Sequence, residues 1–395
     1  NTQTLETVVI RAQRLDEARA GIQTQTGASV YTIDQTAIQA QLGGDNTLLN
    51  QVILQSPDVA QDSFGQLHVR GEHNGLQYRL NGIILPEGIS VFGQTLDPRL
   101  ISSMKLITGA LPAEYGLRTA GIIDLTTKAG SFQPGGSVSV YGGSQETIQP
   151  SFDYGGSSGS VNYFVSGDFI RNDLGIESPD GSSTPEHDRT QQYHGFGYFE
   201  DILDENNRLS LILSTSNGVF QIPNSMGLQP TGVSGVTGLG PNGVLKAGTT
   251  YLYPSESLNE NQREITHFGV ASWQHSSGNF DIQTSLVVRY SSLNFYPDEL
   301  GDLLYDGLGQ MASKADTAYG IQTDAAYQFS DTHTLRAGFY LQNDKASSRT
   351  SSQVLPVNAA GFQTSTNPLV IPDNGSKTQN MYSVYVQDDW IPLSQ

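Results

Sequence analysis

The sequence predicts a large antiparallel membrane β-barrel that begins with a small α/β domain. After residue 130, polar and apolar side chains alternate with a period of two over about ten segments. The links between these segments alternate between tight turns and long polar stretches, as the two rims of an outer-membrane barrel require. Residues 30–130 instead mix short helical and extended patterns, which indicates a separate domain before the barrel.

The amino-acid composition limits the kinds of site and partner that this protein can have. The 395 residues include no cysteine, which excludes disulfides and thiolate metal sites. No stretch approaches the roughly 18 apolar residues of a spanning helix, and a mean hydropathy of −0.32 is also compatible with a barrel whose apolar residues alternate. The net charge of −19 argues against nucleic acid as a partner.

Residues 1–29 show no clear apolar periodicity, and we predict a flexible tail there. One β-prone run, Thr7–Ile10, stands out in this polar segment. An unpaired run of this kind can add to the edge of a partner's sheet.

The small domain is predicted over residues 30–130. It should begin with a strand at 30–33 and a helix that ends at Gly43 and Gly44. A second helix should follow, with Asp45 as N-cap and Pro57 beyond its end. Short strands are expected at 66–71, 76–85, 102–108 and 121–128. Because residues 106–130 are small and partly charged, we expect them inside the barrel and not on its wall.

The barrel is predicted over residues 131–395. Its candidate strands lie at 137–144, 147–155, 160–172, 190–201, 206–217, 262–276, 279–294, 315–330, 333–346 and 379–391. In the strand at 279–294, Leu286 should face lipid and Gln283 should face the lumen. Long loops are expected near 173–189, 218–261, 295–314 and 347–378.

Four stretches in order carry a resemblance to a known family. They are "LETVVIRA", "LHVRGEHNGLQYRLNGIILPEG", "ISSMKLITGALPAEYGLRTAGIIDLTTKAG" and "MYSVYVQDDWIPLS". The chain resembles the TonB-dependent outer-membrane receptors. The resemblance implies a TonB box in residues 1–29, a plug domain at 30–130, and the N-terminal part of a barrel of about 22 strands at 131–395, with the remainder expected to be missing.

The resemblance also implies site residues. TonB should bind Glu6, Thr7, Val8, Val9 and Ile10. Candidate substrate contacts at the plug apices are Asp62, Phe64, His73, Asn74, Phe92 and Gln94. Candidate charged latches between plug and barrel are Arg70, Glu114 and Arg118.

The function that the resemblance implies is active import of a scarce ligand, with a ferric siderophore as the first candidate. TonB, part of the TonB-ExbB-ExbD complex, would relay the energy. The location would be the outer membrane of a Gram-negative bacterium, with a periplasmic N-terminus and contacts to lipid and lipopolysaccharide. Because the HExxH, GxSxG and P-loop patterns do not occur, we expect neither an enzyme nor a bound metal or cofactor.

Two other functional hypotheses remain open at this point. One is a binding or adhesion barrel with a static plug, and the other is a soluble β-rich enzyme.

Overall fold

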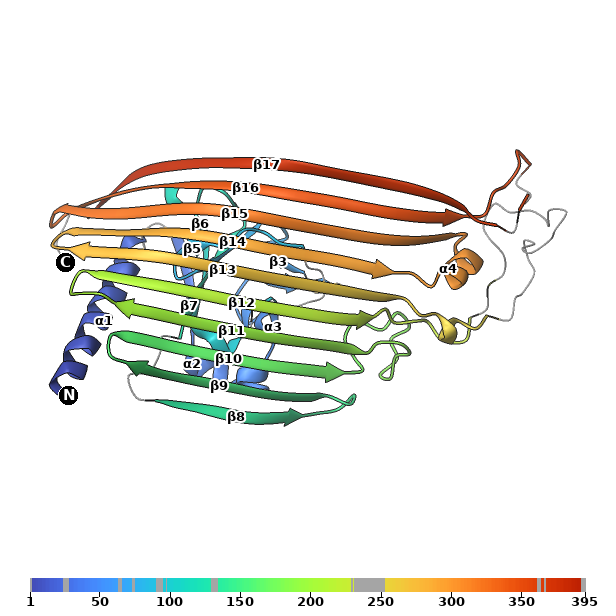
Figure 1. Ribbon diagram of the computed structural model, residues 1–395, viewed down its shortest axis with the longest axis horizontal. Coiled ribbons are helices and arrows are strands. Elements are labelled where there is room, and N and C mark those ends of the chain that lie inside the picture. The colour runs from blue at the N-terminus through green and yellow to red at the C-terminus, as the bar shows by residue number, and fades with distance from the viewer. Residues whose placement is uncertain are drawn as a thin grey trace.

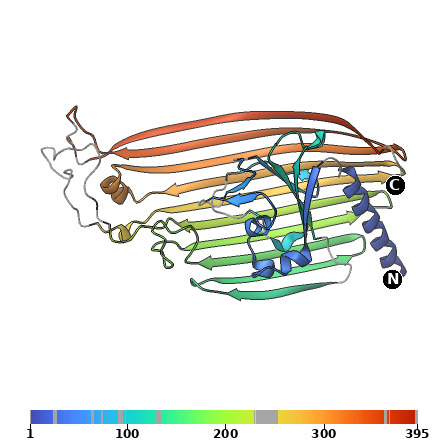
Figure 2. The same cartoon turned by 180° about the vertical axis from the view of Figure 1, so that it is seen from behind.

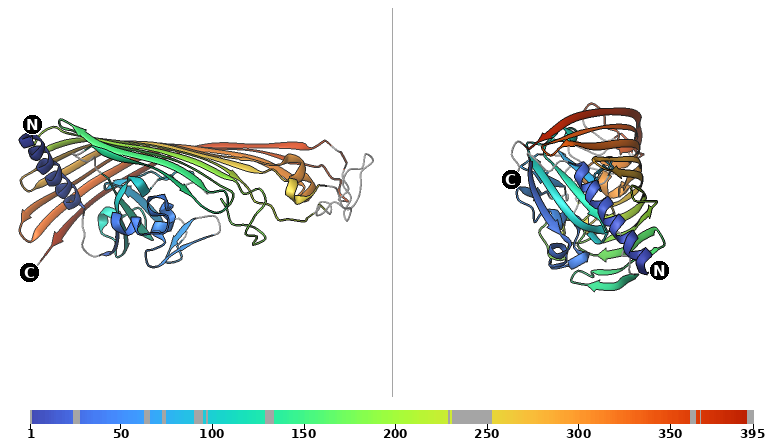
Figure 3. Two further views of the ribbon diagram at one scale, coloured as in Figure 1. Left: turned by 90° about the horizontal axis from the view of Figure 1, so that it is seen from below. Right: turned by 90° about the vertical axis from the view of Figure 1, so that its left-hand side faces the viewer.

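The computed structural model describes residues 2–23, 28–62, 66–72, 75–89, 95–96, 98–128, 134–228, 230, 253–360, 364–365 and 367–391. It consists of a long N-terminal helix, a small α/β domain and one large curved sheet (Figure 1). The small domain lies against one face of the sheet (Figure 2), and this face is the concave one (Figure 3). We call this domain the plug and the sheet the wall.

The wall is a ten-stranded antiparallel sheet in which every strand pairs with its sequence neighbours. Its strands are β8 (Gly135–Gly142), β9 (Ile148–Ser158), β10 (Val161–Asn172), β11 (Thr190–Ile202), β12 (Asn207–Gln221), β13 (Asn261–Ser277), β14 (Phe280–Tyr296), β15 (Leu308–Ser330), β16 (His333–Val354) and β17 (Leu369–Trp390). The sheet is open, with β8 and β17 at its edges (Figure 3). All ten predicted strands are present.

The last three strands extend further than predicted. Residues 308–314, 347–354 and 369–378 are mostly polar and were expected to form loops. They form long antiparallel ladders instead, for example from Ser313 to Arg349 and from Arg349 to Asn374. Backbone pairing carries these strands beyond the region where apolar alternation identifies them.

Side chains alternate across the wall as predicted. Leu286 on β14 is 57% exposed on the outer face, whereas Gln283 is 7% exposed on the inner face. Four links at one end of the sheet are short, at 159–160, 203–206, 278–279 and 331–332. Most links at the other end are long, and one of them contains helix α4 (Glu299–Tyr305). The two ends are called the short-turn end and the long-loop end below.

The plug contains a five-stranded sheet in the order β1-β6-β7-β4-β5. Its elements are β1 (Ala28–Asp34), α2 (Gln35–Gln39), η1 (Gly44–Asn46), α3 (Leu49–Ile53), β2 (Val59–Gln61), β3 (Leu67–Val69), β4 (Leu76–Leu80), β5 (Ile83–Ile84), η2 (Pro98–Leu100), β6 (Ile101–Gly109), η3 (Ala113–Tyr115) and β7 (Gly121–Thr127). Because β7 pairs with β6 and β4, residues 121–127 belong to the plug, as the sequence predicts.

One core joins the plug to the wall. Val52, Ile53 and Met104 of the plug pack in the same apolar cluster as Phe196 and Val287 of the wall.

The predicted N-cap at Asp45 is wrong, because Asp45 lies within η1 and Leu48 caps α3. Extended Leu48 separates the two short helical turns.

The N-terminal segment differs most from the prediction. Residues expected to form an irregular tail form helix α1 (Thr2–Ile22), which lies across the short-turn end of the wall (Figure 3). Val8, Ala12 and Leu15 follow helical spacing and pack against Ile202 at the end of β11. The apolar face exists but is narrow, so the sequence alone did not reveal it.

Arginines of the wall also hold α1. Arg208 on β12 donates from Nη1 to the Asp16 carboxylate over 2.6 Å. Arg336 on β16 donates from Nη1 to the Ile22 carbonyl over 2.6 Å.

Within the described residues, no helix has both the length and the hydrophobicity of a membrane span.

Candidate ligand-binding site

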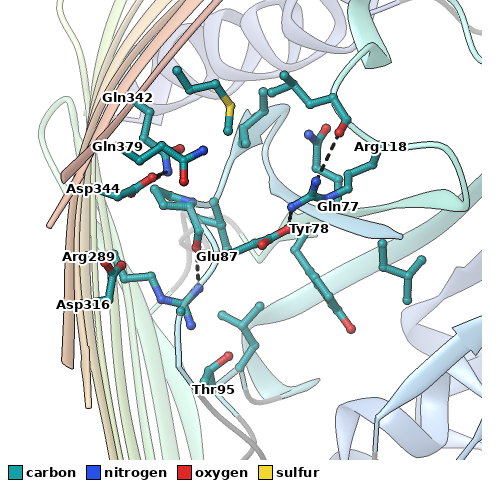
Figure 4. A pocket seen from close by; sticks show the side chains of 18 of the residues that line it. Gln77, Tyr78, Glu87, Thr95, Arg118, Arg289, Asp316, Gln342, Asp344 and Gln379 are labelled. Atoms are coloured by element: carbon teal, nitrogen blue, oxygen red, sulfur yellow. Dashed lines mark hydrogen bonds and ion pairs between the residues drawn. The ribbon is translucent and has the colours of Figure 1, made fainter. Parts of the chain in front are cut away.

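A cavity of about 810 Å³ lies between the plug and the wall. The plug contributes residues of β4, of β5 and the segment that follows it, and Arg118. The wall contributes inward-facing residues of β14, β15, β16 and β17, which stand opposite the plug segment (Figure 4). Labelled lining residues are Gln77, Tyr78, Glu87, Thr95, Arg118, Arg289, Asp316, Gln342, Asp344 and Gln379.

The plug segment after β5 contacts the wall beside the cavity. Arg289 on β14 donates from Nη1 to the Pro86 carbonyl over 2.7 Å (Figure 4). Ser291, two residues further along β14, accepts from the Ile89 amide over 2.8 Å. The backbone of Pro86 and Ile89 therefore fixes residues 86–89 to β14, while Pro86, Glu87 and Gly88 of the same segment line the cavity.

The cavity lining combines both charges with amides. Arg118, Arg289 and Lys377 provide three cations, and Glu87, Asp316 and Asp344 provide three carboxylates. On the plug side, Arg118 forms an ion pair with Glu87. On the wall side, Gln342 donates to both oxygens of Asp344, over 2.6 and 2.7 Å. Such a surface can bind a polar ligand through several directed hydrogen bonds.

Tyr78 also lines the cavity. Burial raises the pKa of Tyr78 from 10.0 to about 12, which moves ionisation of its phenol still further above neutral pH. The lining residues span both bodies, so a ligand in this space would touch the plug and the wall together.

Polar contacts hold the plug below the cavity. Gln322 on β15 accepts from the Ile84 amide over 2.8 Å and donates to the Gly82 carbonyl over 3.1 Å. Gln283 on β14 donates to the Asn81 carbonyl over 3.2 Å. Each of these wall side chains binds plug backbone, so the contact depends on the plug's shape more than on its side chains.

A buried charged contact joins plug and wall on the other flank. Arg99 of η2 lies 3.9 Å from Asp168 on β10, and His194 on β11 lies 3.0 Å from the same carboxylate. Gln149 on β9 donates to Asp168 over 3.3 Å. The sequence analysis missed this group, although the inward position of a carboxylate in the strand at 160–172 was a signal that could have found Asp168.

No protein-family model matches the sequence, and no curated protein matches it. Similar solved structures do exist. The ferripyoverdine receptor of the outer membrane of Pseudomonas aeruginosa, bound to ferripyoverdine, matches with a TM-score of 0.65 and 14% identity over 92% of this chain and 49% of that chain. The ferric citrate transporter FecA in its unliganded form matches with a TM-score of 0.63 and 11% identity over 91% of this chain and 53% of that one.

This chain has the fold of the outer-membrane siderophore receptors. The siderophore receptor PiuA from Acinetobacter baumannii agrees, with a TM-score of 0.61 and 15% identity over 91% of this chain and 55% of that chain. The predicted fold class and the resemblance to TonB-dependent receptors are thereby confirmed at the level of fold. The chain spans about half the length of these receptor structures.

Within this receptor fold, the predicted substrate residues are only partly described. Asp62 accepts from the Gln66 amide over 2.9 Å and lies 3.1 Å from His68 Nε2, so its carboxylate contacts other residues of the plug. Five other candidates lie outside the described residues: Phe64, His73, Asn74, Phe92 and Gln94.

The predicted latch residues separate into two groups. Arg70 pairs with Asp58 over 3.4 Å and Arg118 pairs with Glu87, so both bind carboxylates of the plug itself. Glu114 contacts the wall through its backbone amide, which donates to Gln387 on β17 over 3.3 Å. The structure thus places two of the three predicted latches in ion pairs within the plug.

The predicted TonB-binding residues lie in the first half of α1. The backbone of Glu6, Thr7, Val8, Val9 and Ile10 is helical. Ile10 is 64% exposed.

Among the described residues, no group of three or more His, Asp or Glu side chains is arranged to hold a metal ion.

Proposed function

We propose that this chain is part of a TonB-dependent outer-membrane receptor that imports a scarce polar ligand, with ferric siderophores as the first class to test. The observation that carries the proposal is the cavity of about 810 Å³ shared by a plug and the wall on which it rests. A ligand seated there bridges both bodies, so its binding energy can be used to shift one against the other.

The orientation follows from the general architecture of outer-membrane barrels. Long loops face the outside and short turns face the periplasm. Helix α1 lies at the short-turn end, so its first half would meet a periplasmic protein such as TonB. The cavity is lined by mid-strand residues of β16 and β17, such as Asp344 and Gln379, and by the segment that follows β5.

The segment 86–89 is the candidate coupling element. Its backbone is bound by Arg289 and Ser291, and its own Glu87 lines the cavity. A ligand that accepts hydrogen bonds from Arg289 competes with the Pro86 carbonyl for the same guanidinium. Loss of that contact would loosen the plug on its ligand side, and the pull of TonB on the N-terminus would complete the movement.

Proline substitution tests the TonB step. Helix α1 would have to unwind at Val9 before a TonB partner could pair with it as a strand, and that pairing needs backbone N–H groups. Val9→Pro removes one of these groups and restricts the residue before it. The conservative variant Val9→Thr keeps the backbone donor and the β-branched shape. In the full-length receptor in cells, Val9→Pro should abolish uptake of a labelled ferric chelate while Val9→Thr transports normally.

Surface binding of the same chelate is the internal control. Both variants should bind the chelate as the wild type does, which excludes failed folding as the cause. Normal uptake by Val9→Pro would contradict the proposal and favour the adhesion barrel with a static plug.

A further inference from the structure

One plug segment binds both arginines that line the described cavity. Glu87 forms an ion pair with Arg118, which stands in the plug loop between η3 and β7. The neighbouring carbonyl, that of Pro86, accepts from Nη1 of Arg289 on β14 over 2.7 Å. In Figure 4 the Glu87 side chain points toward Arg118, while Arg289 reaches the same segment from the wall. Two consecutive residues therefore provide the acceptors for one plug arginine and one wall arginine.

The ion pair between Arg118 and Glu87 can be replaced at low cost. Their side chains are 32% and 66% exposed, so solvent and solutes reach both of them. An exposed ion pair contributes little to stability. Arg79 of the plug is different, because it is buried and donates to Gln77 and to the Glu114 carbonyl inside the plug. Of these two arginines, Arg118 is the one whose partner a ligand in the cavity can displace.

Gly88 shows that the same segment is shaped around Arg289. A Cβ atom at position 88 would overlap the Nε, Cζ and Nη2 atoms of the Arg289 guanidinium. The guanidinium group therefore lies directly against the backbone of residue 88, an approach that only glycine allows. With Glu87 on Arg118 and Pro86 on Arg289, the segment fills positions around two cations that the oxygen atoms of a ligand could otherwise take.

The wall carboxylates of the cavity have partners on the wall itself. Asp344 accepts twice from Gln342, which stands two residues before it on β16. Asp316 on β15 interacts with the charge of Arg289 on the neighbouring strand. Lys377 on β17 also lines the cavity and forms no ion pair among the described residues. A ligand therefore meets one unpaired cation and two cations held by a replaceable plug segment, so oxyanions on the ligand gain most from binding here.

We propose that Glu87 is a built-in competitor for the ligand, and that the ligand carries free carboxylates. A ligand carboxylate takes the place of Glu87 on Arg118, because a planar carboxylate can bind a guanidinium through two parallel hydrogen bonds. A second ligand carboxylate takes Arg289 from the Pro86 carbonyl. The ligand class is a metal chelate whose carboxylates do not hold the metal. The inference rests on the proposed function, import of a metal chelate, but it concerns binding and needs neither TonB nor transport.

The test measures binding to the full-length receptor, purified in detergent. The probes are a synthetic ferric trihydroxamate with two free carboxylates and its diamide, which holds iron in the same way but lacks the two charges. The wild type should bind the dicarboxylate about 10- to 100-fold more tightly than the diamide, the range expected for hydrogen bonds between charged groups. Equal affinity for the two probes, or no binding of either, would overturn the ligand class.

A double-mutant cycle tests the competition. Glu87→Gln removes the competing charge and keeps the size of the side chain, so it should bind the dicarboxylate about 2- to 5-fold more tightly than the wild type and the diamide equally. Arg118→Gln should weaken binding of the dicarboxylate about 10-fold. In the Arg118→Gln background, Glu87→Gln should no longer improve affinity, because the cation for which Glu87 competes is absent. A heat-modifiability gel checks that each variant folds.

A matched control comes from another exposed ion pair of the plug. Asp58 pairs with Arg70 away from the cavity lining, and Asp58→Asn should leave both affinities within about 1.5-fold of the wild type. No gain in Glu87→Gln would overturn the competitor role. The same gain in the Arg118→Gln background, or in Asp58→Asn, would also overturn it, because either result indicates a general effect of charge. Loss of energised uptake with the binding cycle intact would contradict the proposed import alone, so the two can fail separately.

Discussion

Arg99 of the plug and Asp168 of the wall form a buried ion pair, with 3.9 Å between guanidinium and carboxylate. His194 on the wall lies 3.0 Å from the same carboxylate. One plug side chain and two wall side chains therefore meet in one buried group. This contact joins η2 to β10 on the flank opposite the ligand cavity. Its strength helps to set how easily the plug leaves the wall.

Loss of the Asp168 charge should loosen the plug. Removing one partner of a buried pair costs about 3–5 kcal/mol, because the other charge stays buried and unpaired. In Asp168→Asn, hydrogen exchange of residues 98–101 should speed up accordingly. The matched variant Asp173→Asn breaks the exposed Asp173–Arg189 pair and should change exchange by less than about 1 kcal/mol. Equal effects of both variants would mean that the buried group does not anchor the plug.

Arg289 should contribute to ligand affinity. Arg289→Ala removes a cation from the cavity and frees the Pro86 carbonyl. A hydrogen bond to a charged group is worth about 1.5–3 kcal/mol, so the Kd of a transported ferric chelate should rise about 10- to 100-fold by isothermal titration. Lys314→Gln removes the same charge from the inner face of β15 outside the cavity and should leave the Kd unchanged. A similar loss in both variants would indicate a long-range charge effect and not a contact.

The two faces of β14 should differ in their tolerance of arginine. Leu286→Arg places a charge on the exposed apolar band, where the cost at the membrane midplane is about 2–4 kcal/mol. Gln283→Arg places the same charge on the polar inner face and should cost the wall less. Urea titration of the folded barrel in lipid vesicles measures both. Equal destabilisation would contradict the assignment of faces.

The loop that contains α4 should respond to pH. Burial, followed by the hydrogen bond to Glu260 and its charge, raises the pKa of Asp302 from 3.8 to about 8. The folded loop therefore binds more protons than the unfolded loop, and its stability falls as pH rises from about 4 to about 8. Hydrogen exchange of residues 299–305, corrected for intrinsic rates, should increase from pH 6 to pH 9. Asp302→Asn should remove most of this dependence, whereas an unchanged slope in that variant would exclude Asp302 as its source.

The sequence was most informative where local pattern and tertiary structure agree. Leu286 and Gln283 were placed on opposite faces because a membrane wall with a wet lumen imposes strict alternation. The plug strands could be predicted equally well, since each has its own apolar run between turn residues. Helix α1 could not be predicted, because its stability depends on Ile202, Arg208 and Arg336, which lie far along the chain.

Side-chain partners were the least predictable feature. Arg70 and Arg118 were expected to reach the wall but bind Asp58 and Glu87 of the plug. Arg99, which does approach the wall, stands in a stretch without a distinctive pattern. Pairing of charges depends on how two domains dock, and alternation within one strand carries no information about that geometry.

Energised import is the central claim, and deletion of Leu5–Ile10 in the full-length receptor tests it most directly. Surface binding and uptake of the same labelled ferric chelate are measured in the same cells, with and without an uncoupler of the inner membrane. We predict unchanged binding, and uptake by the deletion variant that falls to the level of uncoupled wild-type cells. Uptake that persists in the deletion variant and remains sensitive to the uncoupler would contradict a role for α1 in TonB coupling, and uptake insensitive to both would contradict active transport.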